Sequence, residues 1–271
     1  MSPEKHVIEI QSGSKKIKIG DGSFTVMAGP CSIESYQQFF STAKMVAEHG
    51  ASLLRGGVWK LRTSSKSFQG LGSEALEIAQ KVTKELDMGI TIEVTDPRQI
   101  EELYSMVSMF QVGSRNMHNY ALLKELAKQD KPVLLKRGFA ALVSEWVNAA
   151  EYVNQGSDKP KVILCERGIR TFETSTRNTL DLNSAIYAKK NTPYPVIIDP
   201  SHGVGIANLV PDLALASTAL GIDGLIMEVH PNPKEALSDG MQALTFENFE
   251  NLMTKTTKVL TALDRSLQRM Q

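Results

Sequence analysis

The strongest constraint on the fold of this chain is a regular alternation between short apolar runs and longer segments with helical spacing. Most of the runs are nearly continuous in apolar residues, as in parallel strands that are covered on both faces. Eight of them follow one another: FTVMA (24–28), SLLRG (52–56), ITIEV (90–94), MFQVG (109–113), PVLLK (132–136), KVILC (161–165), PVIID (195–199) and GLIMEV (224–229). The segments between them carry apolar residues three and four positions apart, as at Leu209, Leu213, Ala216 and Leu220, which predicts amphipathic helices.

Eight strands, each followed by a helix, within about 250 residues is the count of a (β/α)8 barrel. The competing architecture is an open, doubly wound α/β sheet, which usually has fewer strands or a glycine-rich dinucleotide loop. The chain has no G-x-G-x-x-G after its first predicted barrel strand and no Walker A motif. We therefore predict an α/β protein with the (β/α)8 (TIM) barrel fold.

The first 20 residues predict a separate element, a short β-hairpin. VIEI (7–10) and KIKI (16–19) alternate between apolar and polar residues and flank a polar turn at 11–14. Because alternation gives a strand one apolar face, we expect this hairpin to cover one end of the barrel. No linker or shift in composition divides the rest. We expect residues 1–271 to form one catalytic domain, with 1–20 as an extension and no separate regulatory domain.

Charge and hydropathy argue against two kinds of partner. The chain of 271 residues has 30 Lys and Arg against 30 Asp and Glu, so its formal net charge is zero. Binding to a nucleic-acid backbone needs a clear excess of positive charge, and no apolar run approaches the roughly 18 residues that cross a bilayer. The N-terminus also lacks the apolar core of a signal peptide. We expect a cytoplasmic protein with no nucleic-acid or membrane partner.

In a barrel of this type the active site lies at the carboxyl ends of the strands, and polar residues crowd those positions here. One set is cationic: Arg55, Lys60, Arg62, Arg115, Lys136 and Arg167. Six positive side chains at one mouth would repel one another unless a ligand supplies negative charge. Arginine matches phosphate and carboxylate oxygens with a planar fork, and lysine supplies a point charge. We predict a small phosphorylated and carboxylated substrate, although each cation alone could equally be a surface side chain or part of an ion pair.

A second set at the predicted strand ends consists of Cys31, His202, Glu228 and Asp239. A thiol, an imidazole and two carboxylates suit a borderline transition ion such as Mn, Fe, Co or Zn better than Mg or Ca. Their spacing forms no local ligand signature. From the residues alone the signal for a metal is weak, and a packed thiol, a hydrogen-bonded core histidine and two solvated acids remain open alternatives.

Longer motifs add a resemblance to a known family. They are GPCSIES (29–35), LRGGVWKLRTSSKSFQGLG (54–72), VGSRNMHN (112–119), PVLLKRG (132–138), VILCERGIRTFE (162–173), IIDPSHGVG (197–205) and EVHPNPKEALSDG (228–240). Together they resemble the 3-deoxy-D-arabino-heptulosonate 7-phosphate (DAHP) synthases, in particular the compact subgroup related to the 3-deoxy-octulosonate 8-phosphate synthases. The resemblance runs from about residue 6 to about residue 260.

The resemblance implies a (β/α)8 barrel that condenses phosphoenolpyruvate with erythrose 4-phosphate and releases phosphate, at the first step of the shikimate pathway. It also implies a homo-oligomer, dimer or tetramer, and one divalent metal ion (Mn, Fe, Co or Zn). The family's metal ligands fall on Cys31, His202, Glu228 and Asp239.

The substrate residues are also implied by the resemblance. The family's phosphoenolpyruvate site falls on Arg55, Lys60, Arg115, Lys136 and Arg167, and its aldose-phosphate loop falls on Lys60, Leu61, Arg62, Thr63 and Ser64. We expect three catalytic residues. Lys60 would donate a proton or charge to the aldehyde oxygen, and Glu93 and His202 would handle the protons of the water that adds to the enol carbon.

One residue departs from the family pattern. Leu61 stands where the family has a proline, and because proline restricts the backbone we expect this loop to be less rigid. Arg62, Thr63 and Ser64 still favour the four-carbon aldose. The alternatives are an octulosonate synthase that uses arabinose 5-phosphate and a barrel that binds phosphoenolpyruvate without turnover. A metal-dependent hydrolase would carry more histidine ligands. From chain length we expect insensitivity to aromatic amino acids unless a partner protein supplies regulation.

Overall fold

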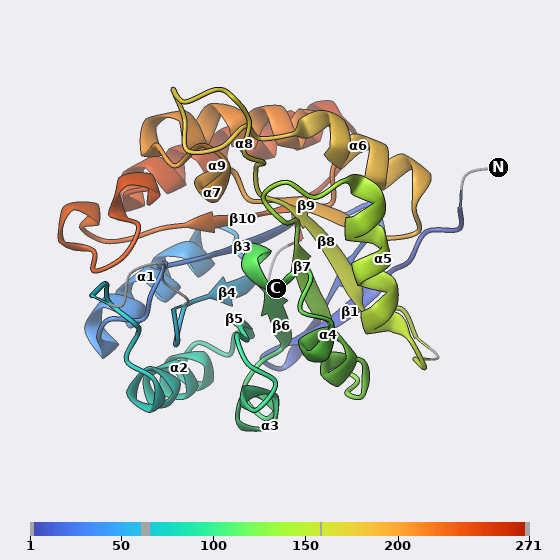
Figure 1. The fold of residues 1–271 in the computed structure, drawn as a ribbon. Helices are drawn as coiled ribbons and strands as arrows, with labels where there is room; N and C mark the ends of the chain where they lie inside the picture. The colour runs from blue at the N-terminus through green and yellow to red at the C-terminus, as the bar shows by residue number, and fades with distance from the viewer. Residues whose placement is uncertain (1–2, 61–65, 158, 269–271) are drawn as a thin grey trace.

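A closed barrel of eight parallel strands forms the centre of the molecule (Figure 1). This computed structural model describes residues 3–60, 66–157 and 159–268. Around the barrel the strands follow the order β10, β3, β4, β5, β6, β7, β8 and β9. Their bounds are Thr25–Gly29 (β3), Leu53–Arg55 (β4), Ile90–Glu93 (β5), Met109–Val112 (β6), Val133–Lys136 (β7), Val162–Glu166 (β8), Val196–Ile198 (β9) and Gly224–Glu228 (β10). Each strand lies within one of the predicted apolar runs or overlaps it closely, so the barrel prediction is confirmed.

Helices connect successive strands and cover the outside of the barrel (Figure 1). They are α1 (Tyr36–Glu48), α2 (Ser73–Glu85), α3 (Gln99–Tyr104), α4 (Tyr120–Ala127), α5 (Val143–Asn154), α6 (Leu182–Asn191), α7 (Pro200–Val204), α8 (Val210–Ala219) and α9 (Phe246–Ala262). Short 3-10 turns supplement them: η1 (Ser114–Asn116), η2 (Ala207–Leu209), η3 (Pro233–Glu235) and η4 (Gly240–Gln242). Within the described ranges, none of the helices has the length and apolar character needed to cross a bilayer.

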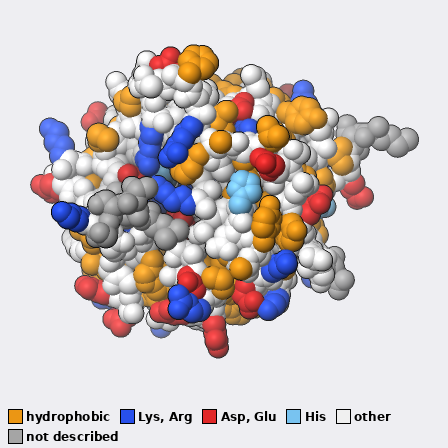
Figure 2. Space-filling model, in the orientation of Figure 1, with side chains coloured by type: hydrophobic (Ala, Val, Ile, Leu, Met, Phe, Trp, Pro, Cys, Tyr) orange, Lys and Arg blue, Asp and Glu red, His pale blue; other side chains and the backbone are white. Residues whose placement is uncertain are grey.

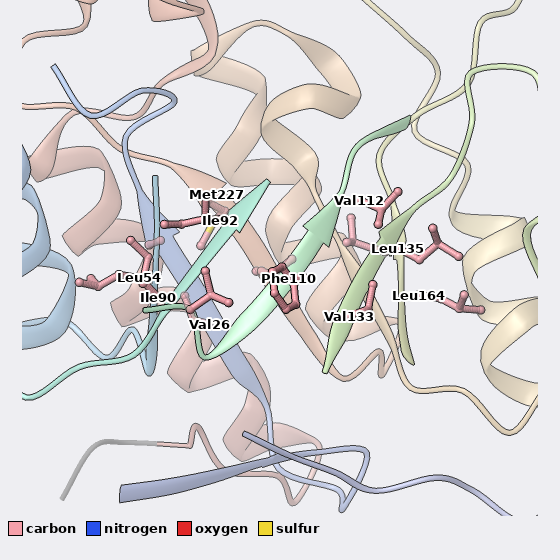
Figure 3. Close-up of a cluster of buried hydrophobic side chains, with 14 of the residues drawn as sticks. Val26, Leu54, Ile90, Ile92, Phe110, Val112, Val133, Leu135, Leu164 and Met227 are labelled. Atoms are coloured by element: carbon pink, nitrogen blue, oxygen red, sulfur yellow. The ribbon is translucent and has the colours of Figure 1, made fainter. Parts of the chain in front are cut away.

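The strands read as nearly continuous apolar runs because both of their faces are buried. Alternate residues such as Val26, Leu54 and Phe110 point outward and pack in the main core with the helices (Figure 3). Their neighbours point into the barrel, where Met27, Leu53, Met109, Leu134, Ile163, Cys165, Ile197 and Ile226 form a second buried cluster. Successive side chains of a strand face opposite ways, so both faces must be apolar to fill both cores.

The N-terminal hairpin closes the amino end of the barrel, as expected. Strands β1 (Ile8–Ser12) and β2 (Lys15–Ile19) pair antiparallel, with Ile8 opposite Ile19 and Ile10 opposite Ile17. These four isoleucines join the cluster inside the barrel. Ser12 Oγ donates a hydrogen bond to the carbonyl of Ser52, just before β4, which places the hairpin at the amino ends of the strands. The carboxyl ends remain available for a site.

Candidate active site

A polar cavity of about 170 Å³ lies at the carboxyl ends of the strands. Its wall combines basic, acidic and aromatic side chains: Lys60, Ser67, Glu93, Gly113, Ser114, Arg115, Lys136, Phe139, Arg167, Arg177, His202 and Asp239. Figure 2 shows Lys and Arg side chains gathered on the face of the molecule turned toward the viewer. The cavity therefore brings together most of the residues singled out from the sequence.

The four predicted metal-ligating side chains converge beside this cavity. Cys31 follows β3, Glu228 ends β10, and Asp239 lies in the segment after β10. One ligand atom from each of these three residues lies within 4.8 Å of the other two. His202, in α7, adds its imidazole from the side of Glu228, with Nε2 3.4 Å from Oε1. Residues as far apart in sequence as Cys31 and Asp239 thus form one cluster, with Sγ 3.4 Å from Oδ2.

The His202 ring is held by Asp199, which the sequence reasoning did not select. Nδ1 lies 2.7 Å from Asp199 Oδ2, and the backbone N–H of His202 donates to Oδ1 at 2.9 Å. Burial would raise the pKa of Asp199, but the charges of His202 and Lys136 lower it well below its ordinary value. An ionised Asp199 accepts a hydrogen bond from the Nδ1–H group and leaves the lone pair of Nε2 available for a metal ion. The sequence did carry a signal for Asp199. An Asp followed directly by a Pro is typical of a helix N-cap, and the N-cap side chain bonds to the residue three positions later, which here is His202.

Cys31 and Lys60 are in direct contact. Lys60 Nζ lies 3.0 Å from Sγ and 3.1 Å from the Cys31 carbonyl oxygen. Burial raises the pKa of the Cys31 thiol to about 12. A thiol binds a metal ion as the thiolate, so ion binding would release its proton. The buried donor set of one sulfur, one nitrogen and carboxylate oxygens fits a transition ion.

Glu228 has a partner on each carboxylate oxygen. Arg55 Nη1 lies 2.5 Å from Oε1, and Gln242 Nε2 donates to Oε2 at 2.6 Å. Burial would raise the pKa of Glu228, but the charges of His202 and Arg55 bring it below its ordinary value. Arg55 is buried in this ion pair and is not among the described residues that line the cavity. Its predicted contact with substrate stays a prediction.

The other predicted cations differ in how they are balanced. Lys136 Nζ forms a buried ion pair with Asp199 Oδ2 at 2.6 Å. Arg167 is buried, and its Nη1 has no hydrogen-bond partner in the described part of the chain. An unpaired buried donor is costly, so the Arg167 guanidinium is suited to an anion in the cavity. Arg115 is exposed at the cavity wall.

Phe139 is an aromatic wall that these arginines share, and the sequence reasoning missed it. The guanidinium carbons of Arg115, Arg167 and Arg170 lie 5.6, 4.8 and 4.7 Å from its ring centroid. Guanidinium groups are attracted to an aromatic face at such distances. No local pattern distinguishes Phe139 from a packing residue, so only the fold reveals this role.

Glu93 ends β5 with its carboxylate at the cavity wall. A Cβ atom on Gly113, at the end of the neighbouring β6, would lie 2.0 Å from Glu93 Oε1. Glycine at this position therefore leaves the space that the carboxylate occupies. Glu93, a predicted catalytic residue, thus lines the same cavity as Lys60 and His202.

Two further side chains were not predicted. Arg177, from the loop between β8 and α6, lines the cavity, and Gln242 is buried at the end of η4. Neither stands in a motif with a recognisable chemical role. Leu61, Arg62, Thr63 and Ser64, which were predicted to form the aldose-phosphate loop, lie outside the described residues.

The chain is similar over most of its length to several known proteins. The model of the DAHP synthetase I family matches residues 5–264. A phospho-2-dehydro-3-deoxyheptonate aldolase of Thermotoga maritima is 42% identical over 261 residues, covering 96% of this chain and 76% of that protein. The crystal structure of the Thermotoga maritima DAHP synthase superposes with a TM-score of 0.92 at 42% identity, covering 97% of this chain and 76% of the other. A 2-dehydro-3-deoxyphosphooctonate aldolase of Bordetella petrii is 30% identical over 269 residues, covering 91% of this chain and 92% of that protein.

Proposed function

The chain belongs to the DAHP synthetase I family, and we propose that it condenses phosphoenolpyruvate with erythrose 4-phosphate to give DAHP and inorganic phosphate. This reaction is the first step of the shikimate pathway. One observation carries the proposal: a thiol, an imidazole and two carboxylates converge beside a cavity lined by Lys60, Arg115, Lys136 and Arg167. Such a cavity suits a phosphorylated carboxylate, and the neighbouring cluster suits a metal ion.

The basic side chains of the cavity bind phosphoenolpyruvate. Arg167 offers its unpaired Nη1 donor to the phosphate or carboxylate. Arg115 adds a second guanidinium beside the same aromatic ring. The ammonium group of Lys136 is held in place by its ion pair with Asp199. It therefore offers hydrogen-bond donors at a fixed position and needs no substrate anion to offset its burial. Holding the substrate in one orientation supplies much of the rate enhancement.

Cys31, His202, Glu228 and Asp239 hold one divalent ion, which we propose to be Mn, Fe, Co or Zn. When bound, the ion polarises the aldehyde carbonyl of the sugar phosphate as a Lewis acid. His202 would serve as a ligand through Nε2, because Nδ1 is hydrogen-bonded to Asp199 and Nε2 lies beside Glu228, another of the four proposed ligands.

Lys60 acts on the aldehyde oxygen. Burial lowers the pKa of Lys60, but the neighbouring Cys31 and acidic groups raise it above its ordinary value overall, so the ammonium is protonated. In the reaction, C3 of phosphoenolpyruvate forms a bond to the aldehyde carbon, and the Lys60 ammonium donates a proton to the resulting alkoxide. Positive charge develops at C2, where water adds.

The remaining steps release phosphate. Glu93, whose carboxylate lines the cavity, takes a proton from the water that adds to C2. In the phosphohemiketal formed in this way, the bond between C2 and the phosphate oxygen then breaks. The C2 hydroxyl gives its proton to the departing phosphate, which leaves the C2 carbonyl of the product. Of the two residues expected to handle these protons, Glu93 is therefore favoured over His202.

A direct test is phosphate release from phosphoenolpyruvate in the presence of Mn²⁺ and either erythrose 4-phosphate or arabinose 5-phosphate. We expect faster release with erythrose 4-phosphate and loss of turnover after treatment with a chelator. Faster release with arabinose 5-phosphate would assign the chain to the octulosonate branch instead. Binding of phosphoenolpyruvate without phosphate release from either mixture would indicate a non-catalytic barrel.

Two further expectations belong to this proposal. The enzyme acts in the cytoplasm, and it assembles as a homo-oligomer, dimer or tetramer. Light scattering coupled to size-exclusion chromatography measures the oligomer mass directly, and a monomeric mass at working concentration would contradict the second expectation.

A further inference from the structure

Arg177, Gln242 and Glu228 form a chain of hydrogen bonds beside the metal-ligand cluster. Arg177 Nη1 donates to Gln242 Oε1 at 2.7 Å, and Gln242 Nε2 donates to Glu228 Oε2 at 2.6 Å. Arg177 comes from the loop after β8, whereas Gln242 and Glu228 belong to the segment that includes and follows β10. These two hydrogen bonds therefore connect the Glu228 carboxylate, a proposed metal ligand, to a different βα unit of the barrel.

The amide of Gln242 can adopt only one orientation in this chain. A guanidinium has donors and no acceptor, whereas an ionised carboxylate has acceptors and no donor. The carbonyl oxygen of Gln242 must therefore face Arg177, and its NH₂ group must face Glu228. Gln242 is only 2% exposed, so water is poorly placed to substitute for either partner. Arg177 in this way fixes which group Gln242 presents to Glu228.

The same guanidinium reaches a second carboxylate of the cluster. Arg177 Nη1 lies 3.7 Å from Asp239 Oδ1. Asp239 has a left-handed backbone (φ 51°) and begins the turn that ends at Gln242, whose N–H donates to the Asp239 carbonyl at 3.2 Å. Arg177 thus contacts both the Asp239 carboxylate and the residue that supports Glu228.

The path of Arg177 is set by α7, the helix that carries His202. The backbone N–H of Arg177 donates to the carbonyl of Val204 at 2.9 Å. A Cβ atom on Gly205 would lie 2.5 Å from the Arg177 Cβ, so glycine there leaves room for the arginine stem. The segments that carry three of the four ligands are therefore joined through Arg177 and Gln242.

We propose that Gln242 and Arg177 are positioning residues that orient the Glu228 and Asp239 carboxylates toward the divalent ion. The inference rests on the proposed function, since it assumes that these carboxylates bind a metal. Groups that hydrogen-bond to metal ligands fix the direction of the ligand lone pairs, and their loss weakens metal binding by about 10–100-fold. Gln242 acts through Glu228, and Arg177 acts through Gln242 and Asp239.

The test measures Mn²⁺ affinity by calorimetry on chelator-treated full-length chain without substrate. Gln242→Met keeps the length of the side chain but removes the amide, and we expect the Kd for Mn²⁺ to rise about 10–100-fold. Arg177→Met should raise the Kd by a smaller factor, because Gln242 still contacts Glu228. Met241→Ala, on an exposed side chain of the same turn, should bind Mn²⁺ as the wild type does. In the double variant the Kd for Mn²⁺ should rise by less than the product of the two single-variant factors, because the two residues act through the same series of hydrogen bonds.

Several outcomes would overturn the inference. Wild-type Mn²⁺ affinity in both single variants would show that the hydrogen bonds of Arg177 and Gln242 do not orient the ligands. A rise only in the Kd for phosphoenolpyruvate in Arg177→Met would make Arg177 a substrate ligand instead. If Gln242→Met fails to fold, Arg177→Met decides the matter, since the Arg177 side chain is 37% exposed. Absence of Mn²⁺ binding by the wild type would overturn both this inference and the metal site of the proposed function, whereas normal wild-type binding with unchanged variants would overturn the inference alone.

Discussion

Asp199 holds His202 by two hydrogen bonds, one to the backbone N–H and one to Nδ1 of the ring. A single carboxylate thereby starts helix α7 and sets the direction in which the imidazole points. The remaining ring nitrogen faces Glu228 at 3.4 Å. The orientation of this predicted ligand therefore depends on a residue that does not itself belong to the ligand set.

Asp199→Ala should weaken Mn²⁺ binding by about 10–100-fold, the usual effect of removing the partner of a ligand histidine. The imidazole would lose the acceptor that fixes its protonated nitrogen, and Lys136 would lose its partner. Titration of chelator-treated protein with Mn²⁺ measures the change, with Asp212→Ala on the exposed face of α8 as the control. Equal affinities of the two variants would refute the role given to Asp199.

The two cysteines can be compared directly, because both are buried and neither forms a disulfide. Cys31→Ala should abolish metal binding and turnover together, because it removes a ligand from the cluster. Cys165→Ala lies in the apolar interior of the barrel and should retain both, at a stability cost of about 1 kcal/mol for the lost buried volume. The checks are metal content, phosphate release and urea unfolding. Turnover by Cys31→Ala in chelator-treated buffer would end the metal hypothesis.

Lys60→Met should reduce kcat by about 10²–10⁴-fold, the range for loss of a proton donor. The side chain keeps its length and apolar stem, so we expect the fold to persist, whereas KM for phosphoenolpyruvate should rise as well, because Lys60 is also one of the predicted phosphoenolpyruvate residues. Steady-state kinetics separate kcat from KM, and circular dichroism monitors the fold. Lys124→Met, on an exposed residue of α4, serves as the control. A variant with near wild-type kcat would remove Lys60 from the mechanism.

Phe139→Leu should raise KM for phosphoenolpyruvate several-fold while kcat changes little. The ring faces the guanidinium groups of Arg115 and Arg167, and each such contact contributes about 0.5–1 kcal/mol at a partly exposed site. Loss of the ring would let both arginines move away from the position in which they meet the substrate. Phe139→Tyr retains an aromatic face and should behave as the wild type. Equal KM values for the leucine and tyrosine variants would contradict this role.

The architecture was predictable because its determinants are local. Runs such as PVLLK are nearly continuous in apolar residues, because Val133 and Leu135 pack in the outer core and Leu134 packs inside the barrel. Alternation in VIEI and KIKI likewise predicted a hairpin with one buried face, and Ile8, Ile10, Ile17 and Ile19 form that face. Patterns of this kind depend only on the geometry of a single strand.

Strand-end positions and motif resemblance selected the four candidate metal ligands from the sequence, and the structure brings their side chains together, but the contacts between them could not be predicted. Arg55 illustrates the difference: the sequence placed it among the substrate residues, and the fold buries it against Glu228, 173 positions away. Arg177, Gln242 and Phe139 had no local signal at all. Which side chains meet across the mouth depends on barrel closure and on the register of neighbouring strands. The sequence alone therefore determined the elements and the chemistry at their ends, whereas tertiary structure decided the pairings, because these join loops from separate βα units that share no periodicity.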